Sequence, residues 1–142
     1  MAHGFFQNLI EQENLQQRIT CDSAGLIDFH KGNPPDSRAR KKMRERGIDI
    51  GSQRSRPINV GDLNDFDHLI AMDRGHFDAV EQMLRRENSS TAKLSMMMDF
   101  TDNPPTVEVP DPYYGDYSGF EEVARLLEPA IRGLLHSLKA QT

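Results

Sequence analysis

Short apolar segments alternate with amphipathic segments along this chain, and that alternation limits the folds open to it. Asp67–Met72 (DHLIAM) reads as a buried strand, and Arg18–Ser23 (RITCDS) and Lys93–Met98 carry shorter or weaker strand signals. Helical patterns separate these three segments. Strands that alternate with helices are typical of an α/β protein built on a parallel sheet. We therefore predict that fold class.

Four segments have the pattern of helices. The first is at the very start, where Phe5, Phe6, Leu9 and Ile10 fall at helical spacing. An alternating α/β chain normally begins with a strand, and Met1 has no capping residue before it. We therefore expect a strand to be missing upstream of Met1. The other predicted helices run from an N-cap at Asp36 to a stop at Gly47, over 75–86, and from a capping box formed by Ser118 and Glu121.

The bulk properties predict one cytoplasmic domain over 1–142. The net charge of −5 argues against a general nucleic-acid binder, and no run approaches the roughly 18 apolar residues of a membrane span. The N-terminal segment lacks the features of a secretory signal. With Cys21 as the one cysteine, an internal disulfide or a cysteine metal cluster is excluded. The histidines are not spaced as metal ligands, so we predict no metal site: His30, His68 and His76.

The most informative segment for chemistry is VPDPYYGD, within the long loop that precedes the last predicted helix. Pro110 and Pro112 bracket Asp111 and hold the backbone extended on both sides of it. Two tyrosines and a glycine follow directly. An acid on a stiff loop beside aromatic rings suits general-acid catalysis on a flat substrate. The plainer alternative is a proline-rich connector whose aspartate caps a turn.

A second candidate site is the basic segment of the predicted helix after Asp36. Its charges could bind a phosphate or a polyanion. Glu45 lies among them and the chain is acidic overall, which favours a solvated helix face instead. The basic residues are Arg38, Arg40, Lys41, Lys42, Arg44 and Arg46.

Several motifs together resemble the low-molecular-weight protein tyrosine phosphatases over essentially the whole chain. They are MAHGFF at the start, CDSAG at 21–25, GNPPDSRA at 32–39, RGIDI at 46–50, SRPI at 55–58, FDHLIAMD at 66–73 and VPDPYYGD. The resemblance implies a doubly wound, three-layer fold with four parallel strands. It also implies hydrolysis of phosphotyrosine through a phosphocysteine, without metal or cofactor.

Family roles carry over where positions match. Asp111 matches the general acid that protonates the leaving phenolate and later activates water. Tyr113 and Tyr114 match the tyrosines at the rim of the substrate cleft. Phe29 stands where the family often has an aromatic residue lining that cleft. The resemblance gives supporting roles around the phosphate-binding loop to Ser23, by hydrogen bonding, and to Asp73, through the loop's arginine.

The sequence departs from the family at the nucleophile. The family's loop, C-x5-R-S, lies directly before the helix with which this chain begins. The residue six positions after Cys21 is Ile27 and not arginine. Cys21 also falls in a predicted strand, and we expect it to be a buried apolar residue. We therefore predict that the first strand and its loop are absent, that these 142 residues are marginally stable or unfolded alone, and that they do not hydrolyse phosphotyrosine.

Three functional hypotheses follow. The first is a tyrosine phosphatase whose sequence here begins at an internal methionine, acting on a phosphotyrosine protein or a small aryl phosphate as a monomer or weak homodimer. The second is a non-catalytic splice form or degenerate paralogue that serves as a binding or regulatory module. The third is an arsenate reductase, ranked last because a disulfide relay needs more cysteines than this chain has.

Overall fold

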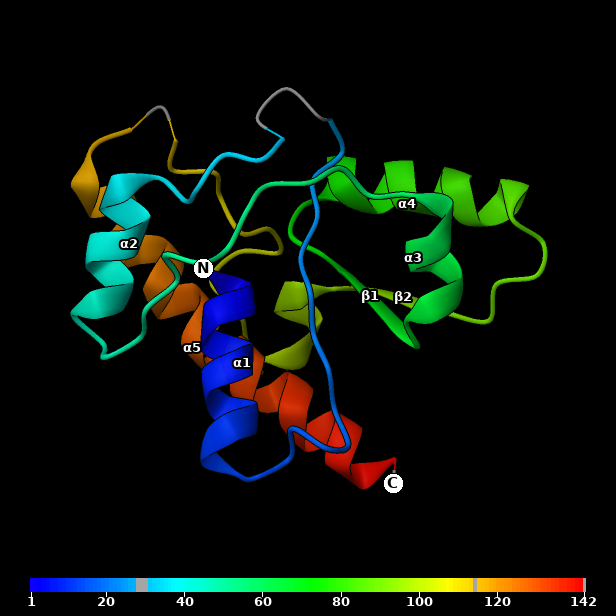
Figure 1. Cartoon of the computed structure of the whole chain (residues 1–142), viewed down its shortest axis with the longest axis horizontal. Coiled ribbons are helices and arrows are strands. Elements are labelled where there is room, and N and C mark those ends of the chain that lie inside the picture. The colour runs from blue at the N-terminus through cyan, green and yellow to red at the C-terminus, as the bar shows by residue number, and fades with distance from the viewer. Residues whose placement is uncertain (28–30, 114, 142) are drawn as a thin grey trace.

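The computed structural model describes residues 1–27, 31–113 and 115–141, and within them it is an α/β protein (Figure 1). No helix in the described part is long and apolar enough to cross a membrane. The elements are, in chain order, α1 (Ala2–Gln12), α2 (Ser37–Arg44), α3 (Val60–Asp65), β1 (His68–Ala71), α4 (Arg74–Arg86), β2 (Lys93–Met96), the 3₁₀ helix η1 (Met97–Phe100) and α5 (Tyr117–Ala140).

The sheet consists of β1 and β2, which run parallel with Leu69 opposite Leu94. Helix α4 connects the two strands and packs against both of them. This βαβ unit confirms the predicted α/β fold with a parallel sheet. The described residues form two strands rather than the four that the resemblance implies.

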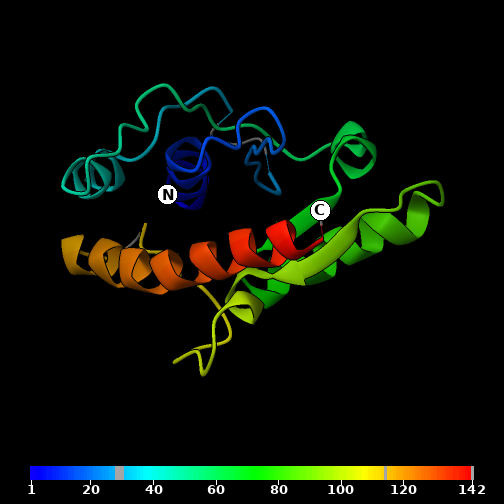
Figure 2. The ribbon, with the colours of Figure 1, turned by 90° about the horizontal axis from the view of Figure 1, so that it is seen from below.

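The hydrophobic core lies around α5, whose apolar stripe contacts α1, α2 and η1. Figure 2 shows α1 and α2 on one side of α5 and η1 on the other. The closest approach is at Gly133, where a Cβ atom would lie 1.8 Å from the backbone oxygen of Phe100. Only glycine allows η1 to cross α5 at this distance. The buried side chains of α1 and α5 include Phe5, Phe6, Ile10, Phe120, Val123, Leu127, Ile131, Leu134 and Leu135.

The predicted strand at Arg18–Ser23 is wrong. This segment forms no ladder with another strand, and the one bridge near it in the described residues joins Gly25 to Pro57. A strand needs a neighbour for its backbone groups, and none of the described segments supplies one here. The third predicted strand is shorter than expected. It ends at Met96, whose amide donates to Asp99 Oδ2 at 3.0 Å as the chain turns into η1.

Two helix starts can be compared with prediction. Asp36 caps α2 as expected, by accepting a hydrogen bond from Arg38 N at 2.8 Å. The predicted capping box at Ser118 is wrong, because α5 is capped by Asp116, which accepts from Ser118 N at 3.0 Å. Glu121 is therefore free to pair with Lys42 of α2 and with Arg46, which follows the end of that helix. Helix α3, which the sequence did not predict, has a capping box between Asn59 and Asp62.

Candidate active site

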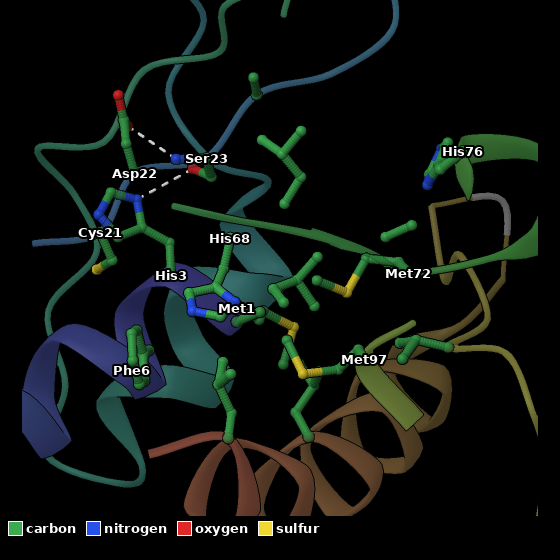
Figure 3. Close-up of a pocket in the computed structure, with 18 of the residues that line it drawn as sticks. Met1, His3, Phe6, Cys21, Asp22, Ser23, His68, Met72, His76 and Met97 are labelled. Carbon is green, nitrogen blue, oxygen red and sulfur yellow. Dashed lines mark hydrogen bonds between the residues drawn. The ribbon is translucent and has the colours of Figure 1, made fainter. Parts of the chain in front are cut away.

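A cavity of about 880 Å³ lies among four parts of the chain, namely the segment 18–26, strand β1 and helices α1 and α5 (Figure 3). Protein interiors are close-packed, with few voids larger than a water molecule. A space of this size is therefore either a binding site or a place that another segment fills. Its walls are mainly apolar and include Phe6, Ile70, Met72, Met97, Leu127, Ile131 and Leu134.

The predicted general acid lies at this cavity. Asp111 is exposed and contributes to the lining together with the two prolines that flank it. Its carboxylate accepts a hydrogen bond from Tyr113 N at 3.0 Å, which turns the chain back toward α5. A local turn thus holds Asp111 through one of its two carboxylate oxygens, Oδ1, and the side chain is exposed.

The loop that carries Asp111 is attached to the carboxyl end of β1. Val109 N donates to Met72 O at 2.8 Å, and Glu108 accepts from Arg74 N at 2.6 Å. In parallel α/β sheets, ligands bind beyond the carboxyl ends of the strands. Asp111 lies at this end of the sheet, and the cavity extends from there along the whole of β1.

Three other predicted site residues line the same cavity: Ser23, Asp73 and Tyr113. Ser23 Oγ is hydrogen-bonded to His3 Nδ1 at 3.0 Å, as Figure 3 shows. Asp73 caps α4 by accepting from His76 N at 2.7 Å. Asp111 and Tyr113, from one loop, therefore share the lining of one large cavity with Ser23 and Asp73, from two other parts of the chain. The remaining two, Phe29 and Tyr114, lie outside the described residues.

Cys21 is unsuited to act as the nucleophile. Its thiol is half-buried and donates to Gln7 Oε1 at 3.3 Å. Burial raises the pKa of the Cys21 thiol to about 11, and the nearby carboxylates of Asp22 and Glu11 act in the same direction. The reactive form of a cysteine is the thiolate, and catalytic sites lower the pKa rather than raise it. The sequence-based rejection of Cys21 therefore has a physical basis.

The predicted solvated face of the basic segment is found only in part, because Lys41 and Arg44 are exposed whereas the other four basic residues are partly or fully buried. Lys42 is buried and pairs with Glu121 of α5 at 2.6 Å, and Arg46 pairs with the same carboxylate at 3.1 Å. Arg38 donates to the backbone of the loop that carries Asp111. Sequence reasoning missed these contacts because their partners are distant along the chain.

The whole chain, residues 1–142, matches the family described as low molecular weight phosphotyrosine protein phosphatase. The chain belongs to this family. It is 33% identical over 141 residues to the low molecular weight protein-tyrosine-phosphatase YfkJ of Bacillus subtilis, covering 99% of this chain and 88% of YfkJ. A putative phosphatase of the family from Synechocystis, slr0328, is 37% identical over 139 residues, which are 96% of this chain and 86% of that protein.

Solved structures of other phosphatases have the same fold. The crystal structure of a protein tyrosine phosphatase from Entamoeba histolytica, with Hepes in its active site, superposes with a TM-score of 0.90 at 34% identity, over 99% of this chain and 88% of that one. A Drosophila arginine phosphatase superposes with a TM-score of 0.91 at 25% identity, over 97% of this chain and 88% of that one. Each of these relatives therefore has a part without a counterpart in this chain.

Proposed function

We propose that this domain hydrolyses phosphotyrosine with Asp111 as the general acid, once a cysteine loop completes the site. The observation that carries the proposal is the position of Asp111, on a stiff loop at the rim of the large cavity beyond the carboxyl end of β1. Membership of a phosphatase family supports the reaction class. Phenol has a pKa of about 10, so the tyrosyl oxygen leaves poorly unless an acid protonates it.

The proposed reaction has two steps. A thiolate attacks the phosphorus atom, the bond to the tyrosyl oxygen breaks, and that oxygen takes the proton of Asp111. The Asp111 carboxylate then takes a proton from a water molecule, whose oxygen attacks the phosphocysteine and releases phosphate and the thiolate. Tyr113, at the same rim, is suited to contact the substrate ring. Ser23 and Asp73 also line the cavity, where they can hold the incoming loop and its arginine.

The 142 residues do not supply the nucleophile in this scheme. Their single cysteine has a raised pKa and no arginine six residues after it. We therefore propose that the chain alone does not turn over phosphotyrosine, and that the cysteine and arginine come from a segment outside these residues. In this proposal residues 1–142 are one domain that lacks the first strand and loop of its family.

A chimera tests the proposal directly. The N-terminal segment of YfkJ, which in this proposal supplies the cysteine loop, is fused to the N-terminus of this chain, and hydrolysis of a phosphotyrosine peptide and of phosphoarginine is measured. We expect vanadate-sensitive hydrolysis of the phosphotyrosine peptide by the chimera and none by the 142-residue chain. Phosphoarginine is included because one similar structure is that of an arginine phosphatase.

Two variants of the chimera assign the acid. Asp111→Asn should lower kcat by roughly 10²–10⁴-fold, the usual contribution of general-acid catalysis. Asp102→Asn removes an exposed aspartate from the same long loop and should leave kcat unchanged. Full activity of the Asp111 variant would reject the proposed role.

A non-catalytic role is the second candidate, favoured by the absence of a suitable nucleophile among the 142 residues. It predicts that the 142-residue chain melts cooperatively and binds a phosphotyrosine peptide that it cannot hydrolyse, while the chimera is inactive. Calorimetric titration with that peptide, beside the activity assay, separates the two candidates.

We also propose that the protein acts in the cytoplasm as a monomer or weak homodimer. Light scattering at low and at high protein concentration measures the oligomeric state.

A further inference from the structure

Arg38, in the first turn of α2, binds the backbone of the loop that carries Asp111. Its Nη1 donates to Gly115 O at 2.6 Å, and its Nη2 donates to Tyr113 O at 2.8 Å. Figure 1 shows this loop lying beside α2. One guanidinium therefore joins two carbonyls of the loop to a helix that lies far earlier in the chain.

The guanidinium is itself held from two other sides. Asp36 accepts from Arg38 Nε at 3.0 Å and from Nη2 at 2.9 Å, and the same carboxylate caps α2. The guanidinium carbon also lies 4.7 Å from the centre of the Phe120 ring, which is buried in the first turn of α5. Hydrogen bonds from Arg38 lower the pKa of Asp36, so the pair stays ionised at neutral pH. Arg38 is consequently a fixed support and not a mobile surface side chain.

The contact continues to the carboxylate of Asp111. The Tyr113 carbonyl accepts a hydrogen bond from Arg38, and the Tyr113 amide donates one to Asp111 Oδ1 at 3.0 Å. The Gly115 carbonyl likewise accepts from Arg38, and the Gly115 amide donates to Pro112 O at 3.0 Å. Both residues that Arg38 holds thus also hold the turn around Asp111. If these carbonyls move, the amide that orients the carboxylate moves with them.

We propose that Arg38 is a positioning residue for the general acid, acting through the carbonyls of Tyr113 and Gly115. The inference rests on the function proposed for Asp111. Proton transfer requires heavy atoms within about 2.6–3.2 Å, and a displacement of about 1 Å can lower a rate on the order of 100-fold. Arg38 touches no reacting atom in this arrangement, and its effect passes through the loop.

The geometry requires arginine and not merely a positive charge. Arg38 serves two carbonyls and one carboxylate at once, with donors that diverge in one plane. The planar fork of a guanidinium offers five N–H groups in fixed directions, whereas lysine offers one compact ammonium. Arg38→Lys should therefore keep the charge and still lose the support of the loop.

The first test uses the chimera with the YfkJ segment and does not depend on catalysis. Backbone order parameters are measured for the amides of Tyr113 and Gly115 by nitrogen relaxation. We expect values of about 0.85 in the parent chimera and below about 0.6 in both its Arg38→Gln and Arg38→Lys variants. Arg44→Gln makes the same change at an exposed position of the same helix and should leave these values unchanged. Unaltered order in the Arg38 variants would overturn the proposal, as would loss of order in the Arg44 control.

The second test measures catalysis by the same chimera, and retained hydrolysis of p-nitrophenyl phosphate shows that the Arg38 variants are folded. Phenolate is a poorer leaving group than p-nitrophenolate. Hydrolysis of phenyl phosphate therefore depends more strongly on a general acid than hydrolysis of p-nitrophenyl phosphate does. We expect Arg38→Gln to lower kcat/KM for phenyl phosphate on the order of 10–100-fold, with a much smaller effect on kcat/KM for p-nitrophenyl phosphate, because kcat/KM reports the step in which the leaving group departs.

The double variant separates positioning from general stability. When Asp111 is already asparagine, Arg38→Gln should have little further effect, because both changes remove the same contribution. Equal losses on both substrates, or losses that multiply with those of Asp111→Asn, would overturn the role of Arg38. If Asp111→Asn itself has no effect, the proposed function fails first, and the order parameters still report on the loop.

Discussion

Lys42 Nζ lies 2.6 Å from Glu121 Oε2, and this ion pair joins α2 to the first turns of α5. Glu121 also pairs with Arg46, and Lys42 pairs with Glu45. Lys42 is 6% exposed, so its ammonium relies on these carboxylates and has little contact with water. The pair therefore fixes the helix that holds Arg38 against the helix that follows the Asp111 loop.

Replacing Glu121 by glutamine should lower the melting temperature. The change removes one of the two carboxylates that pair with the buried ammonium of Lys42, and a buried charge that loses such a partner is unfavourable. Glu122→Gln alters the exposed neighbour and should leave the melting temperature unchanged. Thermal unfolding followed by circular dichroism compares the two. Equal melting temperatures for both variants would show that the pair does not stabilise the domain.

Acid should destabilise the domain through the same carboxyl. Hydrogen bonds from Lys42 and Arg46 lower the pKa of Glu121 from 4.5 to about 2. The pKa of Glu121 is lower in the folded than in the unfolded state. The contribution of this carboxylate to the free energy of unfolding is therefore complete above pH 4.5 and is lost as the pH falls toward 2. Urea unfolding at several pH values between these limits should show a steep loss of stability in the parent chain and a shallower one in Glu121→Gln. Parallel profiles would contradict this assignment.

Gly133→Ala should be strongly destabilising. The new Cβ would lie 1.8 Å from Phe100 O, and that backbone atom can move away only if η1 leaves α5. We expect a loss of about 2–4 kcal/mol in the free energy of unfolding, at or above the usual cost of overpacking. Gly75→Ala is the matched control, because its nearest neighbour would be 3.4 Å away. A mild effect at Gly133 would mean that η1 does not cross α5 so closely.

The large cavity should make the 142-residue chain bind hydrophobic dyes. Its walls are mainly apolar, and contact between apolar surface and water is unfavourable unless another segment covers that surface. We expect anilinonaphthalene sulfonate fluorescence to rise with this chain and to fall to the level of YfkJ in the chimera. Equal fluorescence of chimera and chain would contradict the idea that the added segment fills the cavity.

The sequence predicted the fold class and much of the site for identifiable reasons. The strand at β1 was recognisable because apolar residues are continuous there, and the cap at Asp36 because capping is local. Asp111 stood out because two prolines flank it. Each of these signals lies within a few residues of sequence.

The errors arose where structure depends on distant partners. Arg18–Ser23 has the composition of a strand, but strand formation needs a neighbour that the described residues do not provide. Lys42 and Arg46 looked like solvated charges because Glu121 is far away in sequence. The support of the Asp111 loop by Arg38 was invisible for the same reason.

The central claim is that Asp111 protonates the leaving oxygen, and the dependence of rate on the leaving group tests it most directly. In the chimera, kcat/KM is measured for phenyl phosphate and p-nitrophenyl phosphate, with aspartate and with asparagine at position 111. We predict that Asp111→Asn slows phenyl phosphate hydrolysis far more than hydrolysis of p-nitrophenyl phosphate. An equal reduction for both substrates, or no reduction, would contradict the role of Asp111 as the general acid.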